Sequence, residues 1–269
     1  TSRGIGNGIS LIIFAGIAAG LPKALAGTLE LGRTGALSTP LILMVVVVAI
    51  GVIALIVFVE RAQRRLLIQY PKRQVGNRMF QGDTSHLPLK LNTAGVIPAI
   101  FASSLLLLPA TAAGFAGNTN LPGWATSIIA SLQHGQPLFM ALYGLLIAFF
   151  AFFYTAIVFN PKDTADNLKK HGGFIPGIRP GERTAEYIDY VLTRITVVGA
   201  VYLVFVCILP ETLIARTGIP LALGGTSLLI VVSVTLDTVA QIQGHLTAQQ
   251  YEGLIKKSKW RGGKRGRGD

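Results

Sequence analysis

The sequence is poor in charged residues and in cysteine. Only 13% of its 269 residues are charged, against about a quarter in soluble domains. Hydrophobic residues make up 51% of the chain, and the mean hydropathy is +0.56. This composition leaves too little polar surface for a soluble globular protein. Cys207 is the single cysteine, so no disulfide can form within the chain, and its apolar surroundings indicate a packed or lipid-facing thiol.

The sequence also lacks the motifs of a catalytic or metal site. No nucleophile elbow, Walker sequence, intramembrane HExxH or pair of intramembrane carboxylates occurs in it. The four histidines fall in four different loops, and none of them has a partner at zinc-ligand spacing: His86, His134, His171 and His245. These absences argue against an enzyme, and we expect no catalytic residue, metal site or cofactor.

Six apolar stretches are each long enough to cross a membrane as a helix of roughly 20 residues. They occupy residues 8–27, 39–59, 93–114, 138–159, 190–210 and 222–242. The sequence therefore predicts an all-α integral membrane protein built as a helical bundle. The chain begins with Thr1 and has no signal-peptide pattern, and we expect it to be a piece of a longer protein.

Lysine and arginine are concentrated in alternate connecting segments. Residues 60–92, 160–189 and 243–269 hold 7, 5 and 7 of them, whereas residues 28–38, 115–137 and 211–221 hold 1, 0 and 1. Loops rich in Lys and Arg stay on the cytoplasmic side of a membrane. We therefore expect two cytoplasmic loops, a cytoplasmic tail, and helix pairs within residues 1–59, 93–159 and 190–242.

The two internal basic loops have features of a docking surface. Two Pro-Gly pairs flank Ile178 and Arg179, which indicates a stiff, exposed tip. The preceding loop is expected to continue its helix through Arg65 and to form a basic turn at residues 70–78. The alternative is that these residues only orient the chain. We expect the tail from Lys256 onwards to be unstructured.

Polar groups inside the apolar stretches are few. Residues 93–114 contain Ser103, Ser104 and Pro109, which suits a kinked, moving or cavity-lining helix. Alternatively, the serine hydroxyls donate to carbonyls of the preceding turn. Asp237 is a candidate functional carboxylate, although a solvated or hydrogen-bonded helix end is the favoured interpretation.

Five motifs, taken in order along the chain, resemble the bacterial SecY family, the channel subunits of the Sec protein translocon. They occupy residues 4–10, 94–104, 159–170, 176–181 and 224–230. The resemblance covers essentially the whole chain. It implies that the six stretches are the last six of ten helices, so that four helices and a plug precede them in complete family members.

The resemblance also implies residue roles. Ile13, Ile100 and Ile230 would supply part of an apolar pore ring that seals around a crossing polypeptide, and such a ring excludes ions by dewetting. Ser103, Ser104 and Leu108 would lie at a lateral gate, although some relatives carry an aromatic residue in place of Leu108. The residues implied to dock partners are Arg179, Lys72, Arg73, Arg78, Lys169 and Lys170.

The partners implied by the resemblance are the SecE and SecG subunits, the SecA motor, the ribosome through its RNA, signal peptides, nascent chains and membrane lipids. The expected location is the bacterial cytoplasmic (inner) membrane. Two alternatives remain from the residues alone. One is a secondary transporter or small-solute channel, although the expected midplanes lack the polar groups of ion-coupled carriers. The other is a scaffold whose basic loops bind RNA or lipid.

Overall fold

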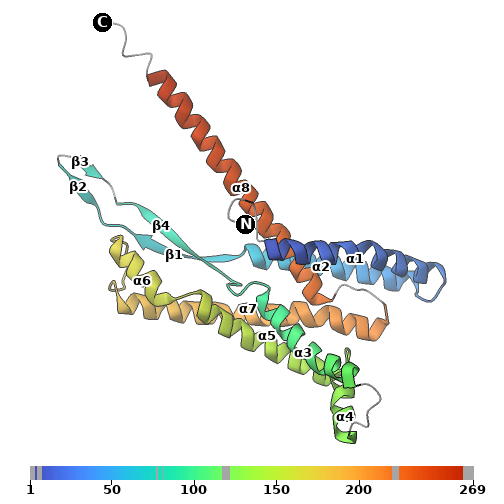
Figure 1. Cartoon of the computed structure of the whole chain (residues 1–269). Coiled ribbons are helices and arrows are strands. Elements are labelled where there is room, and N and C mark those ends of the chain that lie inside the picture. Colours follow the sequence, from blue (N-terminus) through green and yellow to red (C-terminus); the bar gives the residue numbers. More distant parts are fainter. Residues whose placement is uncertain are drawn as a thin grey trace.

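The computed structural model describes residues 4, 8–76, 78–80, 82–116, 122–219 and 224–262. Within this part of the chain, six helices are long and apolar enough to span a membrane, which confirms the six predicted stretches. The helices that contain these spans form an elongated bundle (Figure 1). They are α1 (Gly8–Arg33), α2 (Thr39–Arg61), α3 (Ile97–Ala116), α5 (Pro137–Val158), α7 (Glu182–Thr217) and α8 (Gly225–Gly262).

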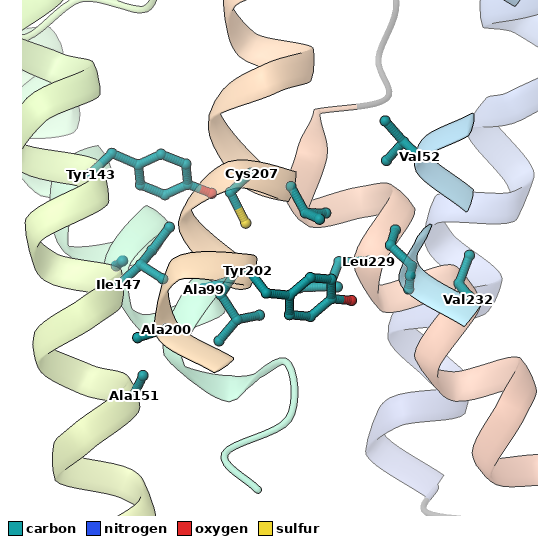
Figure 2. Packing of buried hydrophobic residues seen from close by; sticks show 14 of the residues in the cluster. Val52, Ala99, Tyr143, Ile147, Ala151, Ala200, Tyr202, Cys207, Leu229 and Val232 are labelled. Atoms are coloured by element: carbon teal, nitrogen blue, oxygen red, sulfur yellow. The ribbon is translucent and has the colours of Figure 1, made fainter. Parts of the chain in front are cut away.

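Helix α7 is the central element of the bundle, because it packs against both α5 and α8. Its Leu203, Val206 and Cys207 are fully buried, so the thiol is packed rather than lipid-facing. Figure 2 shows Tyr143 of α5 pointing toward Cys207. The hydroxyl of Tyr143 forms a hydrogen bond with Thr226, which connects α5 to α8 through the core.

A β-hairpin replaces the expected helical continuation after α2. The helix ends at Arg61, and β1 (Gln63–Gln69) pairs antiparallel with β4 (Thr84–Lys90). The prediction of a helix through Arg65 is therefore wrong. Alternate residues Leu66 and Ile68 are buried, and this period of two lets one face of the strand pack against α7.

The hairpin and the short helix α6 (Pro161–Lys170) project from the same end of the bundle (Figure 1). We call this end, formed by residues 62–92 and 160–181, the basic end. The expected turn at residues 70–78 is present as the tip of the hairpin, where β2 (Arg73–Val75) pairs with β3 (Arg78–Phe80). Gly76 lies between them with a φ of 65°, a conformation that favours glycine.

Two further elements differ from the expectations. A short helix, α4 (Gly123–Ser131), occupies the connection that follows α3 at the opposite end of the bundle. Helix α8 continues through Gly262, so the prediction of an unstructured tail is wrong for residues 256–262, while residues 263–269 lie outside the described part. Asp237 is exposed in the middle of this long helix rather than at its end.

Candidate docking platform and channel helices

The two basic loops fold together around one apolar cluster. The hairpin contributes Leu66, Ile68 and Leu89, while α6 contributes Leu168. The remaining buried members are Ile175, Ile188, Val191 and Ile195. The backbone amides of Gln69 and Phe174 each donate to the other's carbonyl at 2.9 Å. We call this unit, residues 62–92 and 159–195, the basic platform.

Arg179 lies on an exposed turn of the platform, between two glycines that need unusual backbone angles. Gly177 has a φ of 82° and Gly181 a φ of 117°, so both adopt conformations that side chains disfavour. The Thr184 hydroxyl donates to the Arg179 carbonyl at 3.0 Å, which fixes the turn to the start of α7. The turn is thus held by its backbone, and the Arg179 side chain faces solvent.

The other candidate docking residues are spread over the same platform. Lys72 is exposed beside the hairpin tip, and Arg73 and Arg78 lie in the paired strands β2 and β3. Lys169 and Lys170 are exposed in the last turn of α6, where positive charge complements the helix dipole. The Asn160 side chain caps the other end of α6 by accepting from the Lys162 amide at 3.1 Å. All six candidates therefore occupy the basic end.

Helix α3 has one packed face and one open apolar face. Ala99, Ala102 and Leu106 are buried against the bundle, whereas Phe101 and Leu108 are 54% and 62% exposed. The helix runs from Ile97 to Ala116 with Pro109 inside it. The Ser103 hydroxyl donates to the Ile100 carbonyl at 3.0 Å, as the alternative interpretation of that serine predicted, and Ser104 is exposed.

The three candidate ring isoleucines lie on three different helices. Ile13 of α1 is 37% exposed, Ile100 of α3 is half-buried, and Ile230 of α8 is 7% exposed. Helix α1 packs against α8, whereas α3 packs against α5. Ala99 and Leu229, which directly precede Ile100 and Ile230, are both fully buried in the core (Figure 2).

A buried polar contact that the sequence did not reveal connects the platform to α3. The side-chain amide of Asn92, only 5% exposed, donates to the Glu60 carboxylate at 2.8 Å and to the Gly95 carbonyl at 3.2 Å. Asn92 thereby joins the end of α2 to the turn that begins α3, across a gap of 32 residues.

Comparison with known proteins gives consistent results. A family model described as SecY matches residues 1–239. The chain is 54% identical over 265 residues to the protein translocase subunit SecY of Vibrio cholerae, which covers 97% of this chain and 60% of that one. It is 55% identical over 262 residues to the SecY subunit of Escherichia coli K12, covering 97% and 59% of the two chains.

Solved structures agree on the fold. One, described as the structure of a protein conducting channel, aligns with a TM-score of 0.60 and 20% identity, covering 89% of this chain and 59% of that one. Another concerns the plug domain of the SecY protein and aligns with a TM-score of 0.61 and 21% identity, covering 89% and 60%. The chain thus spans about three fifths of the length of the proteins that it matches.

Proposed function

The chain belongs to the SecY family, and we propose that it forms part of the pore-forming subunit of a protein-conducting channel in the bacterial inner membrane. The observation that carries this proposal is the identity of 54% to 56% to translocase subunits over nearly the whole chain. In this proposal the subunit moves unfolded polypeptides across the membrane or releases them sideways into lipid. It acts as a passive channel, not an enzyme, and its partners supply the energy.

The basic end is assigned to the cytoplasm in this proposal. The segments assigned to this side, residues 60–92, 160–189 and 243–269, hold 19 Lys and Arg residues, against two in residues 28–38, 115–137 and 211–221, as the charge rule requires for a cytoplasmic face. The platform is proposed to bind the SecA motor or a translating ribosome, whose RNA complements its positive charge. The open apolar face of α3 suits a gate that faces lipid or an apolar signal peptide. SecE and SecG are the proposed membrane partners.

Arg179 provides the sharpest test of docking. Replacing it by glutamate in the full-length protein should reduce SecA-driven export of a secretory precursor into vesicles by roughly tenfold or more. A hydrogen bond to a charged group is worth about 1.5–3 kcal/mol, and the reversed charge adds repulsion. The matched control is Lys162→Glu, which reverses an exposed charge on the same platform away from the Arg179 turn.

The two variants must first be shown to enter the membrane in equal amounts by immunoblotting. Export should then fall for Arg179→Glu and stay close to normal for Lys162→Glu. If both variants export normally, the docking role of Arg179 is wrong. If both fail equally, the platform acts through its total charge and not through the fixed turn.

A further inference from the structure

The outward-facing side of the α5–α7 pair contains an apolar hollow of about 630 Å³ that the proposed function does not use. Its volume is in the range of ligand pockets, roughly 300–1,000 Å³. The residues that line most of it are Ala148 and Phe152 from α5, and Val197, Val201, Val204 and Phe205 from α7. Thr212 is the one hydroxyl-bearing residue in the lining.

The hollow is an elongated groove along the membrane-spanning part of α7. Val197, Val201, Val204 and Ile208 follow the three- and four-residue spacing of a single helix face. From Val197 to Thr212 the helix rises roughly 22 Å, which is less than the hydrocarbon thickness of about 30 Å. The groove therefore lies at the depth of lipid chains.

A cationic group stands at the end of this groove that is nearer the basic end. Arg194 lies on the same face of α7, one turn before Val197, and its guanidinium carbon is 4.8 Å from the centroid of the Tyr190 ring. Stacking uses the face of the guanidinium and leaves its N–H groups available to bind an anion. In the portion that the structure describes, no carboxylate lies within ion-pair distance of Arg194.

We propose that this groove binds an anionic phospholipid, with one acyl chain along Val197, Val201 and Val204 and the phosphate on Arg194 beside Tyr190. The cytoplasmic leaflet is the anionic one, and the basic end faces it in the orientation given above. A transmembrane helix fits less well. Helix contacts in membranes favour small residues, whereas the groove has Phe152 and Phe205 on its lining, 40% and 52% exposed.

The acidic residues of α7 that are nearest to Arg194 in sequence are Glu186 and Asp189. Their negative charge opposes binding of an anionic lipid and so limits its affinity. Glu186 shares a second hollow with Arg179, Arg183 and Tyr190, immediately toward the basic end. With two arginines and one glutamate, that hollow has a net positive charge. Binding at Arg194 therefore depends on one fixed cation and a stacked ring rather than on a large basic surface. This inference needs the membrane orientation but not polypeptide transport.

The experiment places a photo-crosslinking residue at position 201 of the full-length protein, reconstituted with its partner subunits in vesicles of phosphatidylglycerol and phosphatidylcholine in equal amounts. Mass spectrometry of the crosslinked peptide identifies the adduct. We expect phosphatidylglycerol adducts to outnumber phosphatidylcholine adducts about fivefold, the factor for one basic residue near an anionic lipid surface. The control is position 47, an exposed residue of α2 that does not line the groove, where the ratio should be near one.

Two variants of Arg194 separate the effect of its charge from the effect of the shape of its side chain. Arg194→Gln should bring the ratio at position 201 to near one, and Arg194→Lys should preserve most of the preference. Equal ratios at positions 201 and 47 would overturn the proposal, as would an unchanged ratio in Arg194→Gln. A crosslink to a protein partner in place of lipid would show instead that a helix occupies the groove. Polypeptide export in the Arg194 variants is a separate readout, so failure of this site leaves the channel proposal untouched.

Discussion

Ile13 is 37% exposed, about half as exposed as its neighbour Ile12 at 74%. The two side chains have the same chemistry and differ only in direction on α1. In the proposed channel, Ile13 contributes to the apolar ring, whereas the more exposed Ile12 has no assigned role there. This pair therefore separates a ring role from a general need for apolar surface on the helix.

Replacing Ile13 by serine should raise ion leak through the resting channel by about tenfold. The proposed ring excludes ions because apolar side chains keep it dry, and a hydroxyl at position 13 lets water into this dewetted constriction. The leak is measured as the conductance of planar bilayers that contain the full-length protein with its partner subunits. Ile12→Ser should leave it unchanged. Equal conductance of the Ile13→Ser and Ile12→Ser channels would contradict the assignment of Ile13 to the pore ring.

At the scale of elements, the basic platform is a small folded unit rather than a pair of solvated loops. The hairpin, α6 and the first turns of α7 bury one shared apolar cluster. Gly199 of α7 allows the hairpin to rejoin the bundle, because a Cβ atom there would lie 2.6 Å from the Leu91 carbonyl oxygen. A fixed platform presents Arg179 and the lysines of α6 to a partner in one geometry.

Ile68→Ala should loosen this unit. Ile68 is 3% exposed, and removing a buried isoleucine side chain costs about 2–5 kcal/mol. Cleavage of the platform by a protease, followed on the purified full-length protein, should then become at least tenfold faster, because cleavage follows the population of the opened state. Leu67→Ala is the control on the opposite face of the same strand, with 40% exposure. Equal rates would mean that the shared cluster does not hold the platform together.

At the scale of the whole molecule, the bundle has a polarity: the basic connections lie at one end and a connection without Lys or Arg lies at the other. The hairpin and α6 project from one end of the bundle, and α4 lies at the other (Figure 1). The connection that contains α4 has no Lys or Arg between residues 115 and 137. The two ends are thus opposite in both composition and position.

Labelling of single cysteines tests this polarity. Lys72→Cys at the basic end and Ser127→Cys on α4 are both exposed sites, introduced into the full-length protein without its other cysteines. A membrane-impermeant maleimide should label Cys at position 72 only in inverted inner-membrane vesicles, and at position 127 only in intact spheroplasts. Labelling of both positions from the same side would refute the proposed orientation.

The sequence determined the membrane class and the six spans, because these depend on composition and on the length of apolar stretches. It also predicts the polarity, from the placement of Lys and Arg. It did not reveal the hairpin or the shared core of the platform. We expected the helix to continue through Arg65, but burial of Leu66 and Ile68 against α7 favoured a strand. That choice depends on contacts between residues more than 100 positions apart.

The candidate site was likewise predicted from the sequence only in part. The Pro-Gly pairs around Arg179 identify an exposed tip from local backbone chemistry alone, and the structure has both glycines at positive φ. The hydrogen bond between Asn92 and Glu60 and the groove beside Arg194 could not be predicted, since each needs helices that meet only in the folded bundle. The sequence sets which segments can cross the membrane and predicts which way they face, whereas packing decides which side chains meet.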